Sequence, residues 1–531
     1  MSDDEFLAFL AARRRGDNGM VVESRRPRRC GLDVTFEAAR RLRTMTSDRR
    51  ATLRALMQPP RTQDAVPSPS GRFLIHYDTL GGDAAALLDA DEKRIPGTAA
   101  LYAREVGRFF DSAYTVEVTE LGYAPPPFEA GRSAYDVYIK NSGDYGVTEW
   151  LTEIPAATRR GLWTSHIIID NDFSAGFETR GLNGARVTAA HEFHHMVQFG
   201  SYGLCDDDRY FHEMTSTWCE QVVFPGIPDY YQYLDDFLGR PERSFVRDDG
   251  DGYPLLLLPM LIEKRIDRSV LRLAWENIRQ TEPVTSLDAA LRAQHPPSDL
   301  GAEYCALARW SYFTGARTTQ TASGEKFEHA ADYPLARIAS DLPIAGKVAF
   351  AGVLPPLAVM YFRVSSGGDA VAFAVTNTDV SSASRKSMSG TAFSLQAGPD
   401  VTGSGVVPVG NGWSYRFTAS SPIFCVSVLG VLRESSPVSP NPYHPERDGV
   451  IRFGVPKSIV AAKVTLTIFT AGMSRVIRFG DEPVASDAVF GRFVAWNGVG
   501  EDGNPASTGV YFFTLDAGGA VEIGKFVIVR K

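Results

Sequence analysis

The sequence lacks the features of several large protein classes. Its five cysteines are odd in number and include no Cys-x-x-Cys pair, so no disulfide framework is indicated. No apolar run reaches the roughly 18 residues that a transmembrane helix needs, and the acidic start shows no long apolar stretch of a signal peptide. Because the net charge is −8 and the pI about 5.7, nucleic-acid affinity is not indicated either.

The overall composition and the length of the chain are those of a folded protein with several domains. Hydrophobic residues make up 44% of the 531 residues and charged residues 22%, which is ordinary for a globular protein. A chain of this length is expected to form about three or four domains.

The most informative stretch covers residues 187–198 and contains the pattern His191-Glu192-x-x-His195. On a helix, residues i and i+4 share one face, so His191 and His195 can bind one metal ion together. Glu192 lies one step round the helix, near the metal but free to act as a base. The alanines and the Phe, Met and Val around the motif indicate a buried helix rather than a surface one.

A catalytic zinc site needs a third protein ligand and one open position. Glu213 follows His195 by 18 residues, with glycines and three aspartates between them as turn material, which predicts a second helix that brings a carboxylate back to the metal. His212 projects from another side of that helix, and His194 lies about 100° round from His195, so it packs or faces the cleft. Glu220 either orients a ligand histidine or is simply solvated.

These segments resemble the gluzincin metallopeptidases, whose third zinc ligand is a Glu on the next helix. The closer resemblance, over roughly residues 20 to 345, is to a family of secreted bacterial zinc metalloproteases, whose marks match residues 169–172, 191–198 and 213–220. It implies an α+β zincin-type domain, with a sheet-bearing upper half and a helical lower half, and zinc held by His191, His195 and Glu213. Residues 214–216 replace the Gly-Phe-Ala of the aminopeptidase branch, so aminopeptidase activity is not implied.

The expected chemistry is peptide hydrolysis with Glu192 as the base that takes the water proton. Four downstream tyrosines are candidates for stabilising the oxyanion, although each is more easily interpreted as a packing residue: Tyr230, Tyr231, Tyr233 and Tyr253. Residues 167–170 are predicted to form either the edge strand that receives the substrate or an ordinary buried strand. Asp170 and Asp172 are interpreted as a polar turn, with calcium binding as the alternative.

Changes of composition predict four parts of the chain. They are a helical propeptide-like segment with a linker (1–70), the metallopeptidase domain (71–342), a β-sandwich domain (343–434) and an Ig-like C-terminal domain (435–531). The last part resembles the sorting domain of type IX secretion substrates and the flagellar-hook-capping module, through residues 441–443, 464–469, 496–498, 509–513 and 524–531. That resemblance implies export to the cell surface or the medium and contact with secretion machinery. The alternative is a plain Ig-like accessory domain.

Cys30 lies in the segment Arg28-Arg29-Cys30-Gly31, which loosely resembles the cysteine-switch peptide of matrix metalloprotease zymogens. The hypothesis is that residues 1–70 form a propeptide whose Cys30 thiolate occupies the open zinc position and holds the enzyme latent. The alternative is a buried structural cysteine.

The favoured function is therefore a secreted zinc endopeptidase acting on proteins or peptides. The alternatives are a surface adhesion or carbohydrate-binding protein with a non-proteolytic metalloprotease-like domain, and another zinc hydrolase such as an amidase. The intact Glu192 argues against a purely structural metal site, which needs no base.

Overall fold

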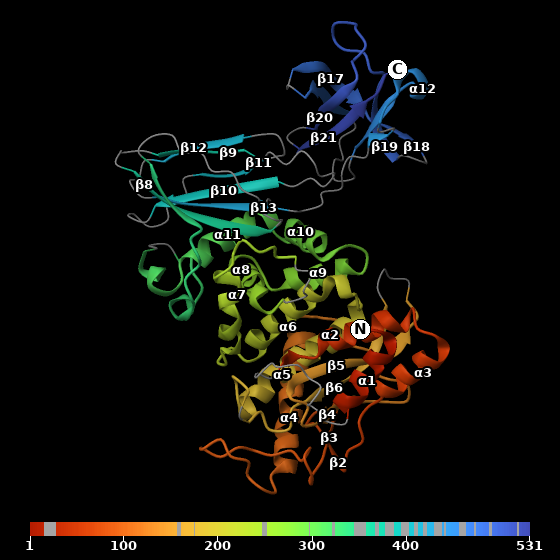
Figure 1. Ribbon diagram of the computed structural model, residues 1–531, viewed down its shortest axis with the longest axis vertical. Helices are drawn as coiled ribbons and strands as arrows, with labels where there is room; N and C mark the ends of the chain where they lie inside the picture. The colour runs from red at the N-terminus through yellow and green to blue at the C-terminus, as the bar shows by residue number, and fades with distance from the viewer. Residues whose placement is uncertain are drawn as a thin grey trace. The chain divides into compact units, whose positions relative to one another are not determined.

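The computed structural model (Figure 1) describes residues 1–14, 28–156, 161–174, 176–246, 252–296, 298–320, 324–344, 357–366, 371–376, 387–394, 403–407, 412–417, 422–429, 438–439, 442–455, 463–471, 474–487, 491–517 and 520–530. The chain divides into two compact units. The first comprises Met1–Ala372, Ser389–Gly405 and Arg416–Val428, and the second comprises Phe373–Met388, Val406–Tyr415 and Leu429–Lys531.

The first unit is built on a six-stranded sheet in the order β1-β5-β6-β4-β3-β2. Its strands are β1 (Arg28–Cys30), β2 (Asp64–Pro67), β3 (Phe73–Tyr77), β4 (Tyr135–Ile139), β5 (Asp144–Ile154) and β6 (Leu162–Ile169). β3, β4 and β6 run parallel, whereas β5 is antiparallel to β6, and β1 runs parallel to β5. The hairpin of β2 and β3 crosses the predicted domain boundary at residue 70.

β6 is a central strand. It pairs with β4 on one side and with β5 on the other, and its apolar residues Ile167, Ile168 and Ile169 are buried. The prediction that residues 167–170 form a substrate-binding edge is therefore wrong, and the alternative of an ordinary buried strand is confirmed. β5 is antiparallel to β6 and lies between β6 and the short edge strand β1.

Helices cover this sheet (Figure 1). The central ones are α4 (Ala99–Tyr114), α5 (Gly181–Val197) and α6 (Arg209–Val223), and α5 packs against α4, α6, β5 and β6. From His191 to Val197 every residue of α5 is buried, because neighbours surround the helix. The remaining helices of the mainly helical half are α7 (Leu234–Leu238), α8 (Leu257–Arg265), α9 (Ser269–Ile278), α10 (Pro283–Gln294) and α11 (Leu300–Tyr312).

The N-terminal segment packs on the outer part of the same sheet. It forms α1 (Asp3–Arg14), α2 (Leu32–Leu42) and α3 (Ser47–Leu56). Phe6, Leu32 and Phe36 share one hydrophobic core with Trp150 and Trp163 of β5 and β6. Arg13 and Arg14 of α1 form ion pairs with Asp144 and Glu149 of β5. The segment is thus packed into the first unit by both apolar burial and charge.

A second sheet in the order β11-β10-β13-β8-β7 follows in the chain. It consists of β7 (Ser340–Ile344), β8 (Ala358–Ser366), β10 (Ser387–Ser394), β11 (Gly403–Val407) and β13 (Pro422–Leu429), while β9 (Val371–Thr376) pairs with β12 (Gly412–Phe417). The Tyr361 hydroxyl donates to the Ala308 carbonyl of α11 at 2.6 Å, which ties β8 to the helical half. Many residues of the predicted β-sandwich 343–434 lie outside the described residues.

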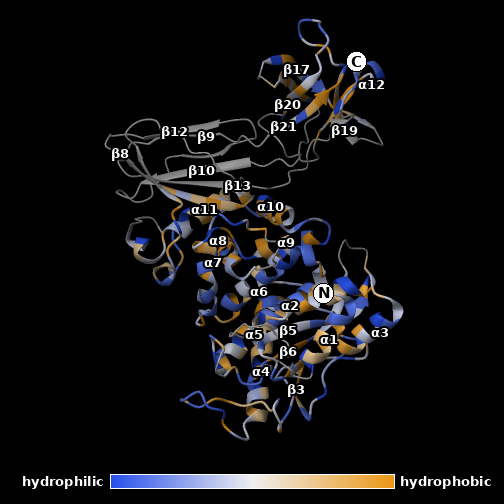
Figure 2. Cartoon of the chain, in the orientation of Figure 1, coloured by the Kyte–Doolittle hydropathy of each residue, from blue (hydrophilic) through white to orange (hydrophobic). Residues whose placement is uncertain are grey.

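Two four-stranded antiparallel sheets dominate the second unit. One has the order β14-β15-β19-β18 and the other β17-β16-β20-β21. Their bounds are β14 (Val438–Ser439), β15 (Ile451–Gly454), β16 (Lys463–Thr470), β17 (Arg475–Pro483), β18 (Ala485–Asp487), β19 (Gly491–Trp496), β20 (Gly509–Ala517) and β21 (Ala520–Ile528), with one short helix α12 (Pro445–Asp448). Phe453 and Trp496 from one sheet and Phe513 and Phe526 from the other share a core, and hydrophobic colour gathers on β20 in Figure 2.

The predicted mixture of helices and several sheets is confirmed. The zincin-type assignment and the Ig-like assignments stay predictions. Among the described residues, no helix is both long and apolar enough to cross a membrane.

Asp170, directly after β6, offers a test of the fold by pH. Its Oδ1 accepts the backbone N–H groups of Asp172 and Phe173 at 3.0 and 2.8 Å, yet burial raises the pKa of this carboxyl to about 7. A raised carboxyl pKa stabilises the fold below the unfolded value of about 4, and this contribution is lost as the pH rises through 7. Asp172 forms an ion pair with Arg94 and accepts a hydrogen bond from the Ser174 N–H, as expected for a polar turn.

Asp170→Asn keeps the accepting oxygen but cannot ionise. We expect this variant to exceed the wild type in free energy of unfolding at pH 8 by about 1–4 kcal/mol, because one pKa unit corresponds to about 1.4 kcal/mol. The difference should shrink at pH 4.5, where the wild-type carboxyl is protonated. Urea unfolding at both pH values measures it, with the exposed Asp91→Asn as control. A difference that is the same at both pH values would contradict this account.

Candidate metal centre

Two neighbouring helices position the predicted ligands. α5 presents His191 and His195 one turn apart, and the chain then passes through a π-helical segment (Gln198–Tyr202) and a short 3-10 turn (Asp206–Asp208) into α6. α6 packs against α5 and presents Glu213 to the two histidines. The helix–loop–helix expected from the spacing is therefore present.

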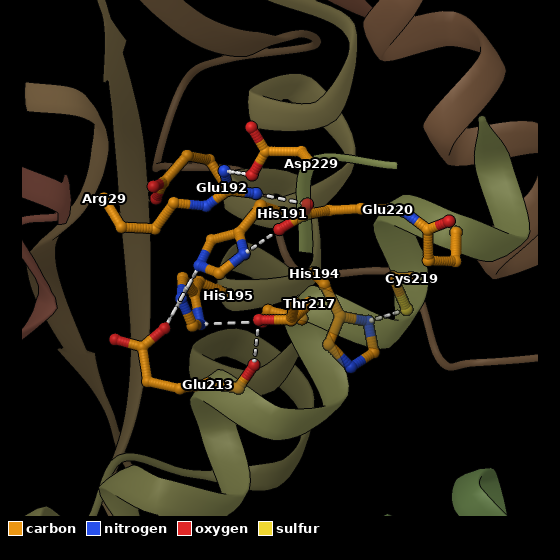
Figure 3. Close-up of polar contacts among 12 residues, drawn as sticks. Arg29, His191, Glu192, His194, His195, Glu213, Thr217, Cys219, Glu220 and Asp229 are labelled. Atoms are coloured by element: carbon orange, nitrogen blue, oxygen red, sulfur yellow. Dashed lines mark hydrogen bonds and ion pairs between the residues drawn. The ribbon is translucent and has the colours of Figure 1, made fainter. Parts of the chain in front are cut away.

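The side chains of His191, His195 and Glu213 converge (Figure 3). His191 Nε2 lies 3.0 Å from His195 Nε2 and 3.1 Å from Glu213 Oε2, and His195 Nε2 lies 3.4 Å from Glu213 Oε2. In a tetrahedral zinc site with bonds of about 2.0–2.1 Å, ligand atoms lie about 3.3–3.4 Å apart. The three atoms are thus already spaced nearly as zinc ligands are.

The fourth member of this group is Cys30. One ligand atom from each of Cys30, His191, His195 and Glu213 lies within 4.8 Å of the others, and all four residues are buried. Cys30 is brought there by β1, because it pairs with Gly146 of β5, and Gly31 N–H donates to the Gly146 carbonyl at 3.0 Å. Two nitrogens, one carboxylate oxygen and one thiol form a donor set that suits Zn²⁺.

The charges of these four side chains also favour the binding of a cation. Burial alone lowers the pKa of His191, but its hydrogen bonds to Glu213 and Glu220 outweigh burial and raise this pKa to about 9. Burial raises the pKa of Glu213, but His191 and His195 lower it well below its usual range. Glu213 therefore brings negative charge to the shared centre, which favours a cation there, whereas Glu220 contacts His191 on the other side of its ring.

Second contacts fix the orientation of both histidines. Glu220 Oε1 accepts from His191 Nδ1 at 2.7 Å, as expected for an orienting carboxylate. Gln198 donates through Nε2 to the His212 carbonyl, so its Oε1 faces the rings of His195 and His212 and accepts from their Nδ1 atoms at 2.7 and 2.8 Å. With Nδ1 protonated, the Nε2 lone pairs of His191 and His195 point to the shared centre.

Glu192 is held beside the ligands without joining them. Thr148 Oγ1 of β5 donates to Glu192 Oε2 at 2.8 Å and to the Glu192 carbonyl at 2.9 Å. Gly146 permits this approach, because a Cβ there would lie 2.8 Å from Glu192 Cγ. Burial and Glu192, which accepts a hydrogen bond from the thiol, raise the pKa of Cys30.

Of the four candidate tyrosines, Tyr253 has a ring contact with a candidate ligand, His191. Its ring stacks 5.8 Å from that of His191 and 5.1 Å from that of Tyr233. Tyr230 and Tyr231 contact Tyr333 instead. Burial and the carboxylate of Glu213 raise the pKa of Tyr253, so its hydroxyl stays a proton donor at neutral pH.

A second group of ligand-type side chains, Glu117, His194 and Cys219, lies behind α5. His194 Nδ1 is 2.9 Å from Glu117 Oε2 and 3.2 Å from Cys219 Sγ. Burial raises the pKa of Glu117 and lowers that of His194, which favours the neutral form of each. We interpret this group as a packing contact, which is one of the two roles expected for His194. Neither group of three or more ligands among the described residues includes Asp170 or Asp172.

Arg29 and Asp229 were missed from the sequence. Arg29 forms buried ion pairs with Glu220 and Asp229 (Figure 3). It also contacts the rings of Tyr145 and Tyr233. Because 200 residues separate Arg29 from Asp229, no local pattern could reveal the pair. Thr148 and Gly146 were missed for the same reason.

The chain matches no protein-family model and no curated protein. One solved structure similar to part of it is PorZ, a surface component of the type IX secretion system of Porphyromonas gingivalis, with 20% identity over 22% of this chain and 15% of that one and a TM-score of 0.14. Another is a BSP domain of a biofilm-associated protein, with 10% identity over 31% and 28% and a TM-score of 0.13. The chain thus spans less than a third of either protein, and likenesses of this size carry no argument about its fold or function.

Proposed function

We propose that this protein is a zinc-dependent endopeptidase held latent by its own Cys30. The observation that carries the proposal is the convergence of His191, His195, Glu213 and Cys30 on one point, with Glu192 alongside. Three protein ligands with one replaceable position are typical of catalytic zinc, whereas four protein ligands are typical of a closed site. Cys30 closes the site from a separate N-terminal segment, which a structural site built on two helices would not need.

The side chains have distinct tasks in the proposed reaction. A bound zinc ion supplies Lewis acidity and makes its water a nucleophile near neutral pH. Glu192 takes the proton from the attacking water and passes it to the leaving amine. Tyr253, whose ring stacks on that of His191, is the tyrosine proposed to donate to the developing oxyanion. Glu220 and Gln198 keep the histidine rings in place.

β5 is the strand proposed to receive the substrate. It lies beside α5, runs antiparallel to β6, and has only the short edge strand β1 on its other side. An extended peptide can take the same hydrogen bonds once β1 has left. This arrangement supports the zincin-type assignment, and the sequence marks of the C-terminal part support Ig-like folding and export to the cell surface.

The test uses the Cys30→Ala variant loaded with one equivalent of zinc. We expect it to hydrolyse casein, to lose this activity on chelation and to regain it with zinc. Zinc binding should be lost in His191→Ala and kept in the exposed control His295→Ala. Hydrolysis that survives chelation would refute the mechanism. Tight zinc binding without cleavage of any peptide would favour a non-proteolytic, adhesive protein.

A further inference from the structure

Arg29 occupies a site built for a guanidinium group. We name this site the arginine cage and define it as Tyr145, Glu220, Asp229 and Tyr233. Arg29 Nη2 pairs with Glu220 Oε2 and Arg29 Nη1 with Asp229 Oδ2, while the guanidinium carbon lies 4.9 Å from the Tyr145 ring centre and 5.5 Å from that of Tyr233. Two carboxylates and two aromatic rings are the partners that arginine prefers.

The arginine cage is buried and rigid. The side chains of Glu220 and Asp229 are 0% exposed, and that of Arg29 is 5% exposed. The Tyr145 hydroxyl accepts the backbone N–H groups of Glu178 and Thr179, both at 3.0 Å, so its ring is fixed. If Arg29 leaves, two buried carboxylates lose their cation, which is unfavourable until another positive group enters.

The arginine cage adjoins the metal centre. Glu220 belongs to both, because its other oxygen accepts from His191 Nδ1 (Figure 3). Arg29 and Cys30 are consecutive in β1, so a peptide that replaces β1 on β5 with its cleaved bond near Cys30 brings a flanking side chain to the place of Arg29.

We infer that the arginine cage is the specificity site of the enzyme and takes an Arg or Lys side chain on a residue that flanks the cleaved bond. This inference rests on the proposed peptidase function. Arg29 then occupies the position of a substrate side chain. The strand β1, which carries Cys30 to the metal ligands, therefore also indicates which side chain the arginine cage binds.

A binding experiment tests the arginine cage without any activity. Arg29→Ala empties it, and acetyl-arginine amide is expected to raise the melting temperature of this variant but not that of the wild type. Acetyl-leucine amide should have no effect, and Asp229→Asn in the Arg29→Ala chain should abolish the shift. If Arg29→Ala does not fold, Arg29→Gln, which removes the positive charge but keeps a polar side chain, replaces it and is tested with the same ligands. No shift with the arginine ligand in the folded variant would overturn the inference.

Cleavage profiling tests the same point during turnover. The double variant Arg29→Ala, Cys30→Ala is expected to cut a peptide library with Arg or Lys enriched at least about tenfold at one flanking position. Asp229→Asn should remove most of this preference, and the exposed control Asp235→Asn should keep it. Apolar or acidic residues enriched at both flanking positions would overturn the inference while leaving the peptidase proposal intact. A melting shift without any cleavage would instead refute the peptidase proposal and keep the arginine cage.

Discussion

Replacing Cys30 with alanine is expected to increase casein hydrolysis by the zinc-loaded, full-length protein at least about tenfold. A thiolate is a strong zinc ligand, and its removal leaves the fourth position to water. A tenfold change corresponds to only about 1.4 kcal/mol, which is small beside the loss of one metal–sulfur bond. Arg29 still holds β1 in place, so Arg29→Ala in the same chain should add a further increase.

The comparison with other cysteines makes this result specific. Cys205→Ala removes a thiol that belongs to neither ligand group and should leave the protein latent. Cys30→Ser should fall between the wild type and Cys30→Ala, because a hydroxyl is a poorer ligand than a thiolate. A Cys30→Ala protein that binds zinc but is as inactive as the wild type would contradict autoinhibition.

The second large effect concerns Glu192. In the Cys30→Ala chain, Glu192→Gln is expected to reduce the rate of peptide hydrolysis by about 10²–10⁴-fold, the range lost with a general base. Glutamine keeps an oxygen that can accept from Thr148, so the fold and the zinc affinity should persist. Initial rates and zinc content measured on the same samples separate the two properties.

A matched control is available for this substitution. Glu178→Gln changes an exposed carboxylate near the same sheet and should alter neither rate nor zinc content. If Glu192→Gln hydrolyses casein as fast as its parent, Glu192 is not the base, whatever the metal does.

The convergence of His191, His195 and Glu213 could be predicted from the sequence because its signals are local. Helical periodicity places His191 and His195 on one face of α5. Because the connection to the next helix is short, that helix packs beside α5 and Glu213 faces the two histidines. The spacing on α6 left two roles open for Glu220, and its contact with His191 Nδ1 is the orienting one. Gln198 was part of the motif, but its contact with both His195 and His212 became visible only in three dimensions.

Other features depended on pairings that sequence patterns do not encode. A strand buried on both faces has a continuous apolar run whether it is central or outermost, so the place of β6 in the sheet could not be predicted. The choice of Tyr253 among four tyrosines depends on helix packing, not on spacing. Arg29 and Asp229 meet only because β1 adds to β5.

X-ray absorption at the zinc edge of the full-length, zinc-loaded protein tests the central claim most directly. The account predicts one sulfur ligand at about 2.3 Å and three nitrogen or oxygen ligands at about 2.0–2.2 Å, with the sulfur lost in Cys30→Ala and kept in Cys205→Ala. A wild-type spectrum without sulfur, or one that Cys30→Ala leaves unchanged, would contradict a zinc centre that is closed by Cys30.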